Sequence, residues 1–140
     1  AGADLIEVEP DLYFQPLICY EAIFPSILRA TANRADLIIQ ITNDAWFGRF
    51  SGPYQHLAIL KMRAIETGIP VARSANTGIS AVISANGKII DSLPLETQGS
   101  LKLAIPQALK PTFYFTWGDS IFLMMILSLI TMRLIVKRYY

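Results

Sequence analysis

One side chain in this 140-residue sequence stands out as a possible nucleophile, the single cysteine Cys19. It follows an apolar run that begins at Pro16, and it precedes Tyr20 and the carboxylate of Glu21. A cysteine where a strand turns into a helix lies beside backbone N–H groups that favour a thiolate and a nearby oxyanion. Cys19 is therefore a candidate nucleophile, and the alternative is an inert buried thiol. Glu21 either stabilises a helix start or shapes the pocket beside Cys19.

A second polar segment, residues 43–48, reads Asn-Asp-Ala-Trp-Phe-Gly and follows another predicted strand. The carboxyl ends of parallel strands meet at one sheet edge, so this segment is expected beside Cys19. Two aromatic side chains in a polar loop either plug the core of the loop itself, line an acyl pocket or contact lipid. The candidate binding residues here are Asn43, Trp46, Phe47 and Gly48.

His56 is the only histidine in the sequence, and it is a further candidate substrate-binding residue. Cysteine plus histidine suggests a dyad in which the imidazole deprotonates the thiol, but a histidine at a helix start more often makes a structural hydrogen bond. With one Cys, one His and no ligand spacing among the carboxylates, the sequence argues against zinc. We expect no metal and no cofactor.

The elements that would position these residues follow from hydrophobic periodicity and from Gly and Pro. We predict strands at 16–19, 35–42, 69–74, 78–83, 88–92 and 101–105, and helices at 22–33 and 53–67. The first strand, helix and second strand form a βαβ unit with a parallel pair. Asn86-Gly87 predicts a hairpin turn, and Gly68 is expected just past the end of the second helix.

The C-terminal segment is strongly apolar. Residues 120–136 would span roughly 25 Å as a helix, near the short limit for a bilayer core of about 30 Å. Apolar residues lie all round this helix, which favours a membrane span over a surface helix. The positive-inside rule puts Arg133, Lys137 and Arg138 in the cytoplasm and the preceding domain outside. A net charge of +1 gives no electrostatic case for nucleic acid.

Five short motifs occur in one order and are followed by the apolar helix. They are Ile18-Cys19-Tyr20-Glu21, Thr42 to Gly48, Gly52-Pro53-Tyr54-Gln55-His56, Met62 to Glu66 and Arg73 to Ser80. Together they resemble the C-terminal part of the apolipoprotein N-acyltransferases, bacterial inner-membrane enzymes with a periplasmic nitrilase-like domain. The resemblance covers the chain from about Gln15 to its end.

The resemblance implies an α/β fold, a partial nitrilase-like αββα sandwich followed by one C-terminal transmembrane helix. Residues 1–111 would be the C-terminal portion of the periplasmic carbon-nitrogen hydrolase domain, and residues 112–140 the membrane anchor and cytoplasmic tail. Cys19 matches the nucleophile, which takes an acyl chain from a phospholipid as a thioester and passes it to the amine of an apolipoprotein's diacylglyceryl-cysteine. The Tyr20 N–H matches an oxyanion donor, and Glu21 and Trp46 match positions at the acyl pocket and its lid.

The sequence departs from the family in one respect. The family's Glu base and oxyanion Lys precede the cysteine by a long stretch, whereas only 18 residues precede Cys19 here, with Glu7 and Glu9 but no lysine. We therefore expect a fragment that is inactive alone. Two rival hypotheses stay open: a membrane-tethered nitrilase or amidase acting on a soluble carbon–nitrogen substrate, and a non-catalytic anchored domain in which Cys19 only packs.

Overall fold

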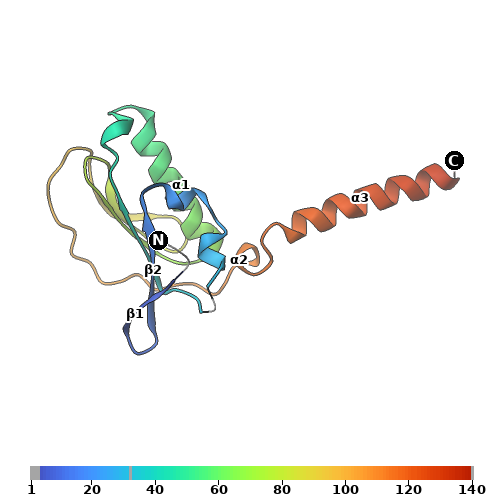
Figure 1. Cartoon of the computed structure of the whole chain (residues 1–140), viewed down its shortest axis with the longest axis horizontal. Coiled ribbons are helices and arrows are strands. Elements are labelled where there is room, and N and C mark those ends of the chain that lie inside the picture. The colour runs from blue at the N-terminus through green and yellow to red at the C-terminus, as the bar shows by residue number, and fades with distance from the viewer. Residues whose placement is uncertain (1–3, 32, 140) are drawn as a thin grey trace.

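The computed structural model describes residues 4–31 and 33–139. A six-stranded sheet carries one long helix on one face, and a second long helix extends away from it at the C-terminus (Figure 1). The strands are β1 (Ile6–Glu9), β2 (Leu12–Ile18), β3 (Leu37–Thr42), β4 (Val71–Ala75), β5 (Ser80–Ile83) and β6 (Ile89–Leu93). The α-helices are α1 (Ser51–Thr67), α2 (Phe113–Trp117) and α3 (Ser120–Tyr139). The described residues also form the 3₁₀ turns η1 (Cys19–Ile23), η2 (Ile27–Arg29) and η3 (Ala45–Phe47).

The strands lie in the sheet in chain order, from β1 to β6. The predicted parallel pair is confirmed: β2 pairs with β3, and β3 pairs in parallel with β4, so Leu17, Gln40 and Arg73 are neighbours across three strands. The predicted hairpin is confirmed as β5 and β6, whose connection includes Gly87. Because β2, β3 and β4 run the same way, their carboxyl ends share one edge, where Cys19 and the segment after Thr42 lie.

α1 covers one face of the sheet. Its buried residues recur every three or four positions, as a core-facing helix requires. Gly68 ends the helix in the left-handed conformation, with φ 68°, as its place in the sequence predicted. The core between α1 and the sheet includes Leu17, Leu28, Ile38, Leu57, Leu60, Ala64, Val71, Ala81 and Ile83.

The predicted helix at 22–33 is wrong over the part that the structure describes, which excludes residue 32. The crossover from β2 to β3 is made by η1 and η2, whose hydrogen bonds join residues three apart, such as Phe24 N to Glu21 O at 3.0 Å. The physical reason is Pro25, which disfavours the helical conformation in the residue before it. Phe24 is accordingly extended, at φ −99° and ψ 95°.

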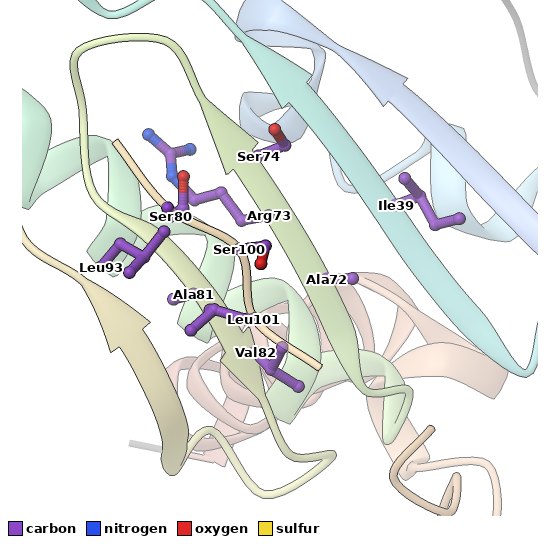
Figure 2. A pocket seen from close by; sticks show the side chains of 11 residues that line it. Ile39, Ala72, Arg73, Ser74, Ser80, Ala81, Val82, Leu93, Ser100 and Leu101 are labelled. Carbon is purple, nitrogen blue, oxygen red and sulfur yellow. The ribbon is translucent and has the colours of Figure 1, made fainter. Parts of the chain in front are cut away.

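The predicted strand at 101–105 is also wrong, since these residues form no described ladder with the sheet. Leu101 and its neighbours lie instead over the face of the sheet that α1 leaves uncovered. There they help to line a hollow of about 270 Å³ with side chains of β3, β4 and β5 (Figure 2). An alternating apolar pattern indicates an extended chain, but a strand also needs an edge to pair with.

The segment before α3 is fastened to the domain near the end of α1. Leu109 N–H donates to the Gly68 carbonyl at 2.8 Å, and the Thr112 hydroxyl donates to the Glu66 carbonyl. Arg29 donates to the carbonyl of Phe115 at 2.8 Å. α3 then projects from the domain (Figure 1), and its residues Ser120–Arg138 are long and apolar enough to cross a membrane, with none buried in the structure.

Candidate active site

Cys19 is the first residue after β2 and opens the turn η1. Its φ is 51°, a left-handed value that non-glycine residues adopt rarely and that is common at functional turns. The residue is partly exposed and its thiol is free. The sequence therefore predicted correctly that the thiol lies at a sharp turn after a strand, and the cysteine is not sealed in the core.

The two residues after Cys19 fix this turn. One carboxylate oxygen of Glu21 accepts a hydrogen bond from the backbone N–H of Ile18 at 2.7 Å, which closes the turn across Cys19. This contact agrees with the stabilising role foreseen for Glu21. Tyr20 is 48% exposed, and its ring lies over His56 at 5.5 Å and near Phe47 at 6.4 Å between centroids.

An apolar hollow of about 370 Å³ opens beside this turn, lined by Tyr20, Trp46 and Phe47. Trp46 is 80% exposed, so the loop does not use it to plug its own core. Phe47 packs edge-on against His56 at 5.7 Å and lies next to Gly52, where an added Cβ would come within 2.7 Å of the Phe47 side chain. The hollow is thus walled by aromatic rings, two of which, those of Tyr20 and Phe47, pack against His56 of α1.

Behind the turn lies a buried polar network that joins β3, β4, α1 and the loop after β3. The Gln40 amide nitrogen lies 2.9 Å from the Cys19 carbonyl oxygen and 3.1 Å from His56 Nε2. His56 Nδ1 lies 3.0 Å from a carboxylate oxygen of Asp44. Arg73 bridges Gln40 Oε1 and the other Asp44 oxygen. All four side chains are almost wholly buried.

The pattern of partners assigns the protons in this network. Arg73 only donates, so Gln40 Oε1 accepts from it and the Gln40 NH₂ group faces Cys19 O and His56 Nε2. His56 Nε2 must then accept, and its proton sits on Nδ1, facing Asp44. Burial lowers the pKa of Arg73, and the neighbouring Asp44 carboxylate opposes that shift.

The hydrogen bonds of His56 argue against the cysteine–histidine dyad that the sequence suggested. Both nitrogens of His56 are engaged, by Gln40 and by Asp44, and the ring is 2% exposed. His56 therefore makes structural hydrogen bonds, the more common role for a histidine at a helix start. Its assignment as a substrate-binding residue stays a prediction.

The structure brings most of the predicted site residues to one edge of the sheet. Asn43 lies there and accepts hydrogen bonds from Ala45 N–H and Asn76, and Gly48 ends η3 with a φ of 65°. Substrate contacts of Glu21, Asn43, Trp46, Phe47 and Gly48 stay predictions.

Sequence reasoning missed Gln40, Asp44 and Arg73 as site residues. For Gln40 and Arg73 the available signal was a polar side chain in the middle of an apolar strand, where an unpaired polar group is costly to bury. Asp44 lies in the loop after β3 and had no such signal.

Comparison with known proteins places the chain and its fold in a family. Residues 8–112 match the family model for carbon-nitrogen hydrolases, three quarters of the chain, and the chain belongs to that family. Solved members have the same fold. A Nesterenkonia amidase carrying acrylamide at its active site cysteine is 25% identical, with a TM-score of 0.52 over 66% of this chain and 39% of that one. A Helicobacter pylori carbon-nitrogen hydrolase is 16% identical, with a TM-score of 0.57 over 69% and 41%.

The resemblance drawn from the motifs is confirmed by curated relatives, which are named apolipoprotein N-acyltransferase. That of Bradyrhizobium diazoefficiens is 53% identical over 104 residues, covering 74% of this chain and 19% of the relative. Those of Rhodopseudomonas palustris and Rickettsia bellii are 45% and 44% identical over 84% and 83% of this chain. The chain spans about a fifth of the length of these relatives.

Proposed function

We propose that this chain provides the nucleophile and part of the acyl pocket of an apolipoprotein N-acyltransferase. The Cys19 thiol gives up its proton, and the thiolate attacks an ester carbonyl of a phospholipid; a C–S bond forms, the C–O bond breaks, and the leaving lysophospholipid alkoxide takes up a proton in place of the one that the thiol released. The amine of a diacylglyceryl-cysteine then attacks the thioester. A C–N bond forms, the C–S bond breaks, and a proton given up by the amine restores the thiol.

The observation that carries this proposal is the position of Cys19, partly exposed in a left-handed turn beside an aromatic hollow. A thiol so placed can be reached by a substrate, and the hollow suits an acyl chain because its lining is apolar. The relatives at 44–53% identity support acyl transfer as the reaction.

Several residues then have defined roles. The N–H of Tyr20 is the oxyanion donor, and Glu21 holds the turn through Ile18. Trp46 and Phe47 form the wall and lid of the acyl pocket. Asn43 and Gly48, which lie on either side of η3, are proposed substrate contacts. No lysine precedes Cys19 in the sequence, so the family's Glu and Lys have no counterpart assigned among these residues.

The membrane location rests on α3. A 19-residue apolar stretch with no buried residue suits a lipid environment, and its basic end favours the cytoplasm. The catalytic domain would then lie in the periplasm against the inner membrane, where both the phospholipid donor and the lipoprotein acceptor are concentrated.

The experiment uses the protein that carries this chain, purified in detergent, with a phospholipid bearing a labelled acyl chain and a synthetic diacylglyceryl-cysteine peptide. We expect labelled acyl-peptide and lysophospholipid from the wild type and neither from Cys19→Ala. Failure of the wild type to transfer the label, with the protein folded, contradicts the proposal.

A second candidate is an amidase that hydrolyses a soluble carbon–nitrogen substrate, favoured by the similarity to the Nesterenkonia amidase. Ammonia released from small amides in the same preparation, with no acyl-peptide formed, would support it. A third, an anchored domain without catalysis, predicts that Cys19 reacts with iodoacetamide no faster in the native than in the unfolded protein.

A further inference from the structure

We infer that Gln40 is a positioning residue for acyl transfer, which fixes the plane of the peptide bond after Cys19 so that the Tyr20 N–H faces the open side of the turn. The inference rests on the proposed function and adds to it a group that does not touch the substrate.

The contact that carries this inference is the one between β3 and the nucleophile's own backbone. The Gln40 side-chain amide donates to the Cys19 carbonyl at 2.9 Å, although 21 residues separate them. Gln40 is fully buried, whereas Tyr20 on the other side of the same peptide bond is 48% exposed. The carbonyl of Cys19 is thus held on the protein side of the turn.

Because of peptide geometry, the contact between Gln40 and the Cys19 carbonyl also orients the Tyr20 N–H, the proposed oxyanion donor. The Cys19–Tyr20 peptide is planar and trans, so its carbonyl and its N–H point in opposite directions. A carbonyl drawn inward by Gln40 leaves the Tyr20 N–H directed outward, toward the side on which a substrate can approach. Rotation of this peptide is the motion that would remove the donor from the site.

The network behind Gln40 keeps its amide group from flipping. Arg73 donates to the Gln40 oxygen, and His56 Nε2 accepts from the Gln40 nitrogen at 3.1 Å. A flipped amide would set its NH₂ against a guanidinium and its oxygen against the Cys19 carbonyl. His56 is in turn oriented by Asp44 at 3.0 Å. The buried network therefore selects one amide orientation, the one that holds the peptide.

The test compares two reactions of the same thiol in the protein that carries this chain. Acylation by a phospholipid develops an oxyanion and needs the Tyr20 N–H, whereas alkylation by iodoacetamide displaces iodide and develops none. In Gln40→Glu the side chain still accepts from Arg73 but donates to neither Cys19 nor His56. We expect acyl-enzyme formation to slow by about tenfold or more, with alkylation within about threefold of the wild type. The matched control is Gln55→Glu, the same change at an exposed position of α1, which should alter neither rate.

A second variant at the same position keeps the inference testable if Gln40→Glu does not fold. Gln40→Met has a side chain of similar length that adds no charge and donates to neither Cys19 nor His56, so it should also lose acylation selectively. Equal losses of acylation and alkylation, or no loss in either Gln40→Glu or Gln40→Met, would overturn the inference. A wild type that alkylates but never acylates refutes instead the proposed function on which it rests.

Discussion

At the scale of single residues, Cys19 is held in a conformation that costs a non-glycine residue roughly 1–3 kcal/mol. Such a turn persists only where the surroundings over-determine it. Here Glu21 closes the turn from one side and Gln40 holds its carbonyl from the other. The geometry of the proposed nucleophile thus depends on Glu21 and on the fully buried Gln40.

The buried ion pair beneath the turn should be costly to break. Asp44→Asn leaves Arg73 buried without its counter-charge, and we expect a loss of about 3–5 kcal/mol in the free energy of unfolding. Denaturant titration of the protein that carries this chain measures it. The control is Glu96→Gln, which breaks the exposed pair with Arg49 and should cost less than about 1 kcal/mol. Equal small losses would show that the buried pair does not stabilise the fold.

Trp46 should affect binding of the phospholipid that donates the acyl chain, and it should not affect the stability of the fold. Because Trp46 is 80% exposed, Trp46→Ala is expected to change stability by less than about 0.5 kcal/mol. Loss of its ring from the hollow should raise the KM for phospholipid about tenfold, as removal of about 1.4 kcal/mol of apolar contact would. Phe50→Ala is the control, since Phe50 is 87% exposed and does not line the hollow. Equal effects of the two variants on KM would count against an acyl pocket there.

At the scale of elements, the strands around the site were predictable because β-branched runs indicate strands and Asn-Gly indicates a hairpin turn from the local sequence alone. The segment after Cys19 was not, because its apolar spacing fits a helix while Pro25 and Phe24 prevent one. The hollow could be anticipated from the aromatic residues after β3. The network of Gln40, His56 and Arg73 could not, since it joins three elements whose register only the folded sheet defines.

The joint between the domain and α2 should depend on Arg29. This side chain donates to the Phe115 carbonyl and lies 5.8 Å from the centre of the Tyr114 ring. Arg29→Ala should therefore speed amide hydrogen exchange over residues 113–118 by about tenfold, the effect of losing a charged hydrogen bond of about 1.5 kcal/mol. The control is Arg49→Ala, which removes an exposed arginine that is distant in sequence from α2. Unchanged exchange in α2 would mean that Arg29 does not hold it.

At the scale of the whole molecule, the proposed function divides its requirements between the domain and α3. The sheet edge carries the thiol and the aromatic hollow, while α3 offers an apolar surface that the domain does not cover. α2 and its arginine contacts connect the two. The boundary at residues 111 and 112 stays a prediction.

The proposed orientation predicts which side of the membrane each end of α3 reaches. In a Cys19→Ser background, Lys110→Cys should react with a membrane-impermeant maleimide once the outer membrane is opened. Lys137→Cys should react only after the inner membrane is lysed, because the basic end is expected in the cytoplasm. Labelling of both positions, or of Lys137→Cys alone, before lysis would contradict a span with a cytoplasmic C-terminus.

The measurement closest to the central claim is the intact mass of the protein that carries this chain after brief exposure to a phospholipid of defined acyl chains, without acceptor. The account predicts one added acyl group, mapped to the peptide containing Cys19, removed by hydroxylamine and missing from Cys19→Ala. An unmodified wild-type protein, or an adduct that persists in Cys19→Ala, would contradict it.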